Sequence, residues 1–141
     1  MTPSSGSAGI RDPGRHLPTV LLVDDDPETQ QLIRLVLRRR CEVLMASSVV
    51  EARCQLAAHL GEVRMIFIDL MLAKPDDGLA LTRQLRRTVP WRKIPIVAET
   101  AHADYRLAAL RAGCDEFLAK PFYAKDLHSI VDRYLERESR F

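Results

Sequence analysis

The stretch that decides the fold is residues 20–27, which read VLLVDDDP. A short, continuous apolar run of this kind is typical of a strand that is covered on both faces of a parallel sheet. The pair Asp26-Pro27 is typical of a helix start, with Asp26 as the N-cap and proline at the first helical position. The stretch therefore predicts a buried strand that ends in carboxylates and is followed at once by a helix.

The rest of the chain repeats this alternation of strand and helix. Further apolar runs are found at residues 43–46, 65–68, 94–98 and 117–119. Apolar residues recur at helical spacing after each strand: Leu32, Ile33, Val36, Leu37; Val49, Ala52, Leu56, Leu60; Leu81, Leu85; Leu107, Leu110; and Leu127, Ile130, Val131, Tyr134, Leu135. A five-fold alternation of this kind favours a three-layer α/β domain with a parallel sheet.

The ends of the predicted helices carry matching signals. Ser48 and Glu51 are spaced as a capping box at the start of the second helix. Gly61 and Gly113 occupy positions typical of the residue that terminates a helix.

Composition narrows the classes of protein. The chain has 141 residues, of which 47% are hydrophobic and 28% charged, so it suits one globular domain. A net charge of +2 gives no argument for a nucleic-acid or membrane surface. The 3 cysteines have no metal-ligand spacing, which favours reduced thiols and a cytoplasmic location. Residues 1–18, rich in Gly, Ser and Pro, predict a flexible leader before a domain at 19–141.

Strong polar groups follow four of the five predicted strands. They are Asp24, Asp25 and Asp26, then Asp69, then Thr100, and then Lys120 before Pro121. Ligands of open α/β sheets bind at the carboxyl ends of the strands, where these groups would meet. Carboxylates without His or Cys suit Mg²⁺. Asp69 is a candidate nucleophile toward phosphorus, with Lys120 and Thr100 beside the transferred group. For Asp26 we favour the helix-cap interpretation.

Four segments resemble the signature segments of the response-regulator receiver family. They are VDDDP at 23–27, IDLML at 68–72, ETA at 99–101 and AKPF at 119–122, and the resemblance covers about residues 19–138. It implies a flavodoxin-like (βα)5 fold with strand order 2-1-3-4-5. It also implies a cis peptide bond between Lys120 and Pro121.

The resemblance further implies a role for each matching residue. Asp69 matches the phosphoacceptor, and the implied Mg²⁺ ligands are Asp25 and Asp69 directly, Asp24 largely through water, and the backbone carbonyl of Met71. Thr100 matches the switch hydroxyl, Phe117 the aromatic switch residue, and Lys120 the lysine that pairs with the phosphoryl group.

The segment between Asp69 and Gly78 departs from the family pattern. It is one residue longer than usual, and its proline, Pro75, is displaced. Two positions linked in the family to the dephosphorylation rate hold Met71 and His102. Because Met71 has no polar group to orient a water, we expect slow loss of the phosphoryl group.

The implied function is a signalling switch and not an enzyme. The implied donor is a sensor histidine kinase or a histidine phosphotransfer protein, and the implied output surface is the fourth helix, fifth strand and fifth helix. We expect no direct nucleic-acid or membrane contact, and a monomer or a phosphorylation-dependent dimer. The sequence leaves no room for an output domain, so we expect either a stand-alone regulator or a receiver excised from a longer protein.

Two alternatives stay open. One is an interaction module that uses the fold without phosphorylation. The other is an aspartyl-phosphate phosphatase of the haloacid-dehalogenase type, in which Asp24 and Asp26 would supply the two acids.

Overall fold

The computed structural model describes residues 16–139. Its strands are β2 (Thr19–Val23), β3 (Glu42–Ala46), β4 (Val63–Asp69), β5 (Ile96–Thr100) and β6 (Glu116–Ala119). Its helices are α1 (Pro27–Leu37), α2 (Val49–Ala58), α3 (Asp77–Arg86), α4 (Arg106–Ala112) and α5 (Ala124–Ser139), with 3-10 turns η1 (Val89–Trp91) and η2 (Ala103–Tyr105). The leader predicted for residues 1–18 lies almost wholly outside the described residues.

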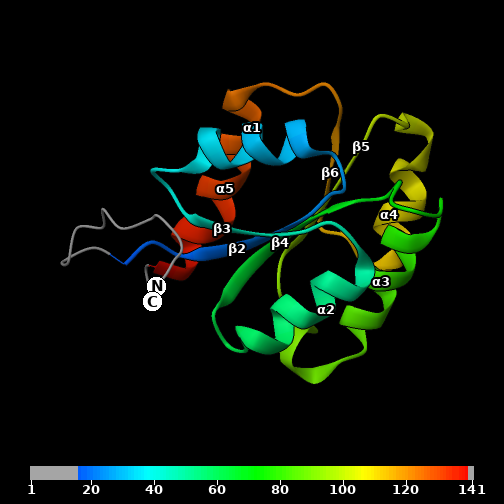
Figure 1. Ribbon diagram of the computed structural model, residues 1–141, viewed down its shortest axis with the longest axis horizontal. Helices are drawn as coiled ribbons and strands as arrows, with labels where there is room; N and C mark the ends of the chain where they lie inside the picture. The colour runs from blue at the N-terminus through cyan, green and yellow to red at the C-terminus, as the bar shows by residue number, and fades with distance from the viewer. Residues whose placement is uncertain (1–15, 140–141) are drawn as a thin grey trace.

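The strands form one parallel sheet in the order β3-β2-β4-β5-β6. In order of appearance along the chain this is 2-1-3-4-5, so the predicted flavodoxin-like topology is confirmed. Helices α1 and α5 cover one face of the sheet, and α2, α3 and α4 cover the other (Figure 1). The carboxyl ends of all five strands therefore meet at one edge.

Each face of the sheet has its own hydrophobic cluster, because side chains alternate along a strand. Leu22, Phe67 and Val97 pack with α1 and α5. Val23, Ile68 and Ala98 pack with α2, α3 and α4. The residues that follow Val23, Ile68 and Ala98 therefore point to the opposite face, which is the face covered by α1 and α5.

The helix signals are largely confirmed. Asp26 caps α1 by accepting from the backbone N–H of Thr29, and Ser48 caps α2 by accepting from that of Glu51. The Glu51 carboxylate accepts from the N–H of Ser47 and not from Ser48, so the capping box is displaced by one residue. Gly113 ends α4 with a positive φ, as predicted. Gly61 also has a positive φ but lies in the turn after α2, whose C-cap is His59, so its predicted role as the terminating residue was wrong.

Several predicted positions were wrong. The fourth strand is Ile96–Thr100 and not 94–98, because the N–H of Ile94 closes a turn onto Trp91 and Pro95 has no N–H to donate. Leu32, Leu60 and Leu107 are about half exposed. In α4 the buried residues are Ala109 and Ala112, which belong to the hydrophobic cluster on that face of the sheet.

Among the residues that the structure describes, no helix is both long enough and apolar enough to span a membrane.

Candidate functional site

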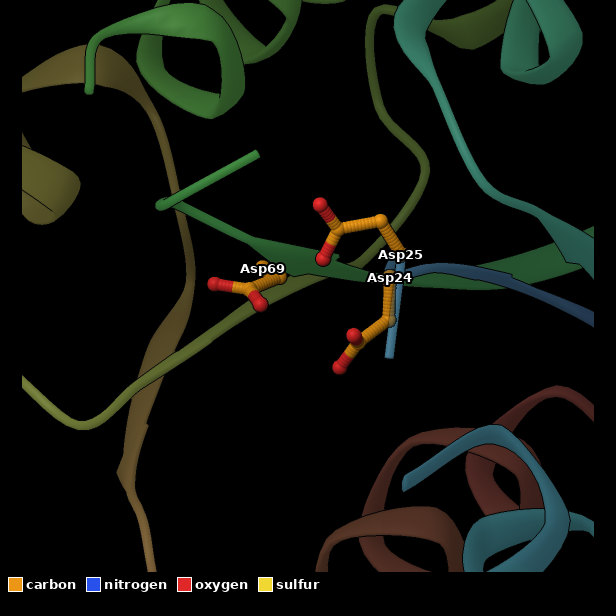
Figure 2. A group of neighbouring side chains, drawn as sticks. All are labelled: Asp24, Asp25 and Asp69. Carbon is orange, nitrogen blue, oxygen red and sulfur yellow. The ribbon is translucent and has the colours of Figure 1, made fainter. Parts of the chain in front are cut away.

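Three carboxylates converge at the carboxyl edge of the sheet. Asp24, Asp25 and Asp69 each offer one oxygen, and these oxygens all lie within 4.8 Å of one another. Figure 2 shows them coming from the adjacent ends of β2 and β4. Asp24 and Asp69 are buried, whereas Asp25 is exposed. The group thus has a buried floor and one carboxylate that faces the solvent.

The backbone and its neighbours fix Asp24. Its N–H donates to the carbonyl of Ala46 at 2.9 Å, so the ladder between β2 and β3 continues past Val23. Its Oδ1 accepts from the N–H of Asp26 at 2.8 Å. Asp26 itself turns away to cap α1, and the hydroxyl of Thr29 lowers the pKa of its carboxyl. The cap interpretation of Asp26 is confirmed.

Asp69 is the last residue of β4. Its Oδ1 accepts from the backbone N–H of Met71 at 2.9 Å, which leaves Oδ2 for other partners. Burial raises the pKa of the Asp69 carboxyl, while the N–H of Met71 and the ammonium of Lys120 oppose that rise. A partly desolvated carboxylate with one oxygen held in place is well suited to act as a nucleophile.

Lys120 joins the two buried aspartates. Its Nζ lies 3.2 Å from Oδ2 of Asp24 and 3.2 Å from Oδ2 of Asp69. Burial lowers the pKa of Lys120, but the carboxyl groups of Glu99, Asp24 and Asp69 outweigh it, and the net shift is upward. The predicted cis peptide bond before Pro121 is confirmed. The structure therefore brings together Asp24, Asp25, Asp69 and Lys120, as the sequence predicts.

Thr100 and Phe117 lie on the opposite face of the sheet from Asp24, Asp69 and Lys120. Thr100 follows the same alternation as Ala98, and Phe117 packs against the cluster under α2, α3 and α4. The Thr100 hydroxyl accepts from the backbone N–H of His102 at 3.2 Å, and within residues 16–139 it donates to no other group, so its hydrogen can donate to a ligand. Its carbonyl accepts from the backbone N–H of Lys120 at 2.8 Å, so the ladder between β5 and β6 continues past Ala119.

The segment from Met71 to Gly78 closes over the end of β4. A Cβ at Gly78 would lie 2.6 Å from the carbonyl oxygen of Asp69 and 2.7 Å from Cα of Leu70. Only glycine allows the start of α3 to approach the strand this closely. The longer loop thus returns to a fixed point beside Asp69.

Comparison with known proteins gives this arrangement a family. The family model described as the response regulator receiver domain matches residues 20–132. The chain belongs to this family.

The receiver resembles full-length regulators and isolated receivers alike. It is 34% identical to the transcriptional regulatory protein AruR of Pseudomonas aeruginosa over 125 residues, which cover 86% of this chain and 50% of AruR. Several curated relatives that it matches are about twice its length.

Solved structures of receivers and response regulators have a similar fold. A putative response regulator from Chloroflexus aurantiacus superposes with a TM-score of 0.78 at 31% identity, covering 86% of this chain and 99% of that one. The receiver domain of the sensor histidine kinase PA1611 from Pseudomonas aeruginosa gives 0.74 at 31% identity, with coverages of 86% and 99%. That domain has a magnesium ion coordinated in its active-site cleft.

Sequence reasoning about this receiver missed one residue, Glu99. Its side chain is fully buried, and its Oε1 lies 3.9 Å from Nζ of Lys120. Burial raises the pKa of Glu99 well above its usual range, with Asp24 and Asp69 adding to the rise and Lys120 opposing it. The sequence did contain a signal: counting on from Val97, alternation places Glu99 on the same face as Asp69.

Proposed function

We propose that this receiver accepts a phosphoryl group on Asp69 from a phosphohistidine. The donor would be a sensor histidine kinase or a histidine phosphotransfer protein. The observation that carries the proposal is the position of the Lys120 ammonium, 3.2 Å from both Asp24 and Asp69, beside three carboxylate oxygens within 4.8 Å of one another. Transfer of a phosphoryl group depends mainly on positioning and on neutralising charge, and this set of groups supplies both.

The chain's own residues have distinct parts in the transfer. An Asp69 carboxylate oxygen attacks phosphorus, so an O–P bond forms while the P–N bond to the donor histidine breaks and its electron pair returns to the imidazole. The N–H of Met71 holds the other oxygen in place. Lys120 exchanges its contact with the Asp69 carboxylate for one with a phosphoryl oxygen, and the Thr100 hydroxyl donates to another.

The acidic group fits Mg²⁺. Its side-chain donors are all oxygens, and Mg²⁺ prefers a few carboxylates together with water and phosphate oxygens. The residues that would hold the ion are Asp25, Asp69 and Asp24, the last largely through water, together with the carbonyl of Met71. When bound, the ion supplies positive charge to the oxygens of the transferring group.

The output belongs to the same proposal. Once Asp69 is phosphorylated, Thr100 and Phe117 change position and alter the surface of α4, β6 and α5, which a downstream protein reads. The phosphorylated form acts in the cytoplasm as a monomer or a dimer, and the receiver itself makes no direct nucleic-acid contact. Because the chain spans about half of several relatives, such as AruR, the activity of the whole protein is also a proposal.

Met71 should make the phosphoryl group long-lived. Its side chain stands two residues after Asp69 and has no group that could orient an attacking water. Replacement by asparagine, which could orient one, should shorten the lifetime measured after removal of the donor. Fast loss in the wild type that Met71→Asn hardly alters would contradict this.

The deciding experiment is incubation with a small-molecule phosphodonor and Mg²⁺ followed by intact mass spectrometry. The wild type should gain one phosphoryl group, Asp69→Asn should gain none, and the matched control Asp26→Asn should behave as the wild type. No gain by the wild type, under conditions that label a control receiver, would favour the interaction-module alternative. The phosphatase alternative predicts instead that hydrolysis of a phosphomonoester is lost in Asp24→Asn and kept in Asp69→Asn.

A further inference from the structure

Glu99 is a buried carboxyl group that the proposed function leaves unused. Neither of its oxygens has a hydrogen-bond partner among the described residues, and the side chain is fully buried. Buried polar groups in proteins are nearly always hydrogen-bonded, and a buried charge without a partner is costly. A group of this kind beside a candidate site therefore calls for a physical explanation.

The position of Glu99 points to Lys120. Glu99 on β5 is the register partner of Asp69 on β4, so the two side chains leave neighbouring strands on the same face of the sheet. Asp24 and Lys120 are on that face as well. The Lys120 ammonium thus lies among three carboxyl groups, at 3.2 Å from Asp24 and Asp69 and 3.9 Å from Glu99.

The three carboxyl groups depend on Lys120 to different degrees. Asp24 also accepts from the N–H of Asp26, and Asp69 also accepts from the N–H of Met71. Glu99 has no such second donor among the residues described. Movement of Lys120 away from the cluster would therefore cost most at Glu99, because its buried carboxyl group would lose the ammonium that favours its charged form.

We propose that Glu99 is a positioning residue that restrains Lys120 in the unphosphorylated protein and competes with the phosphoryl group for its ammonium. This rests on the proposed function of Asp69. A phosphoryl group on Asp69 draws Lys120 toward its oxygens and leaves Glu99 uncompensated. Glu99 thereby weakens the hold of the site on the phosphoryl group and shortens the life of the phosphorylated state.

The first test compares the wild type with Glu99→Gln, which keeps the shape of the side chain and removes its charge. After removal of the phosphodonor, the aspartyl phosphate should persist about five-fold longer, which is the size of a coupling between contacting charged groups. Beryllofluoride, a phosphoryl mimic, should bind tighter by a similar factor in ¹⁹F NMR. An unchanged or shorter lifetime would overturn the competition.

Two further variants serve as a control and as a replacement for Glu99→Gln. Glu62→Gln removes the same charge from an exposed loop between α2 and β4 and should leave the lifetime unchanged. Glu99→Met is a second neutral replacement of similar volume, to be used if thermal unfolding shows that the glutamine variant does not fold.

A second measurement needs neither metal nor phosphorylation. Relaxation of the Lys120 ¹⁵Nζ signal, identified by its loss in Lys120→Gln, reports how firmly the ammonium is held in the metal-free protein. The order parameter should fall in Glu99→Gln and not in Glu62→Gln. If it falls although the wild type accepts no phosphoryl group, the proposed function fails while the restraint of Lys120 stands. If it does not change, the role of Glu99 is overturned whatever the phosphorylation result.

Discussion

The two faces of the sheet edge carry different chemistry. On the face covered by α1 and α5, the Lys120 ammonium is held among the carboxyl groups of Asp24, Asp69 and Glu99. The exposed Asp25 points away from that face (Figure 2). On the face covered by α2, α3 and α4 are Thr100 and Phe117. Among the described residues, the threonine hydroxyl has a single hydrogen bond, which it accepts from the backbone N–H of His102.

This difference suggests how one small site can serve two tasks. The charged face is dense with ion pairs that resist movement, which suits the binding of a phosphoryl group. The other face holds a hydroxyl with a free hydrogen and a half-buried ring, which suits residues that change position. If the two tasks are divided in this way, substitutions on the two faces should have different effects.

The largest expected effect should separate phosphorylation of Asp69 from the structural change that follows it. Lys120→Gln removes the only cation of the described cluster, and the rate of phosphorylation of Asp69 by a small donor should fall about 100-fold. Thr100→Val keeps the shape and removes the hydroxyl. It should reduce that rate far less, while the NMR shifts that beryllofluoride causes in α4, β6 and α5 become smaller. Equal loss of phosphorylation in both variants would contradict the division.

The next largest effect concerns Gly78, where the start of α3 contacts the end of β4 beside Asp69. Gly78→Ala forces a Cβ against the backbone of Asp69 and Leu70, and the free energy of unfolding should fall by about 3 kcal/mol in urea denaturation. Gly61→Ala is the control, because its Cβ would meet nothing within 4 Å and only the positive φ is strained. That strain should cost about 1 kcal/mol. Similar losses would mean that the close approach at Gly78 is unimportant.

Each face also buries one thiol, which gives a prediction on pH. Burial raises the pKa of Cys41, on the α1/α5 face, to about 12 and that of Cys114, on the other face, to about 11. The folded protein keeps these protons when the unfolded chain, with a thiol pKa near 9.0, has lost them. Their contribution to stability is therefore complete below pH 9 and is lost as the pH rises toward 11 and 12.

The expected size at pH 10 is about 1 kcal/mol for each thiol. Cys41→Ala and Cys114→Ala should each flatten the loss of unfolding free energy between pH 8 and pH 10, measured by urea denaturation. Cys54 is exposed, and Cys54→Ala should leave the slope unchanged. A slope that none of the three variants alters would contradict the assignment to buried thiols.

The smallest effect concerns the helix starts on the two faces. Ser48→Ala removes the cap of α2 and should lower the unfolding free energy by about 1 kcal/mol. Asp26→Ala removes the cap of α1 and should lower the melting temperature. Neither substitution should change the amount of phosphoryl group that the protein takes up. A loss of uptake in Asp26→Ala would mean that Asp26 takes part in the acidic site with Asp24, Asp25 and Asp69.

Most of the site was predictable because parallel strands bring their carboxyl ends together. Asp24, Asp69 and Lys120 follow apolar runs that are plain in the sequence, and strand order came from the family resemblance. Glu99 was missed because the fourth strand was placed two residues too early, which left this glutamate outside it. Leu60 and Leu107 were misplaced because helical spacing does not say how closely a neighbour packs, and alanines 109 and 112 permit a closer approach than leucine does.

Strict alternation along the strands also bears on how such a domain tolerates insertions. One residue added within β5 before Glu99 would exchange the sides of Glu99 and Thr100, so that the acid would take the place of the hydroxyl. The segment between Met71 and Gly78 is not a strand, so an added residue does not move side chains from one face of the sheet to the other. This segment must only return to the contact between Gly78 and Asp69. Insertions should therefore be tolerated in that loop and not at the strand ends.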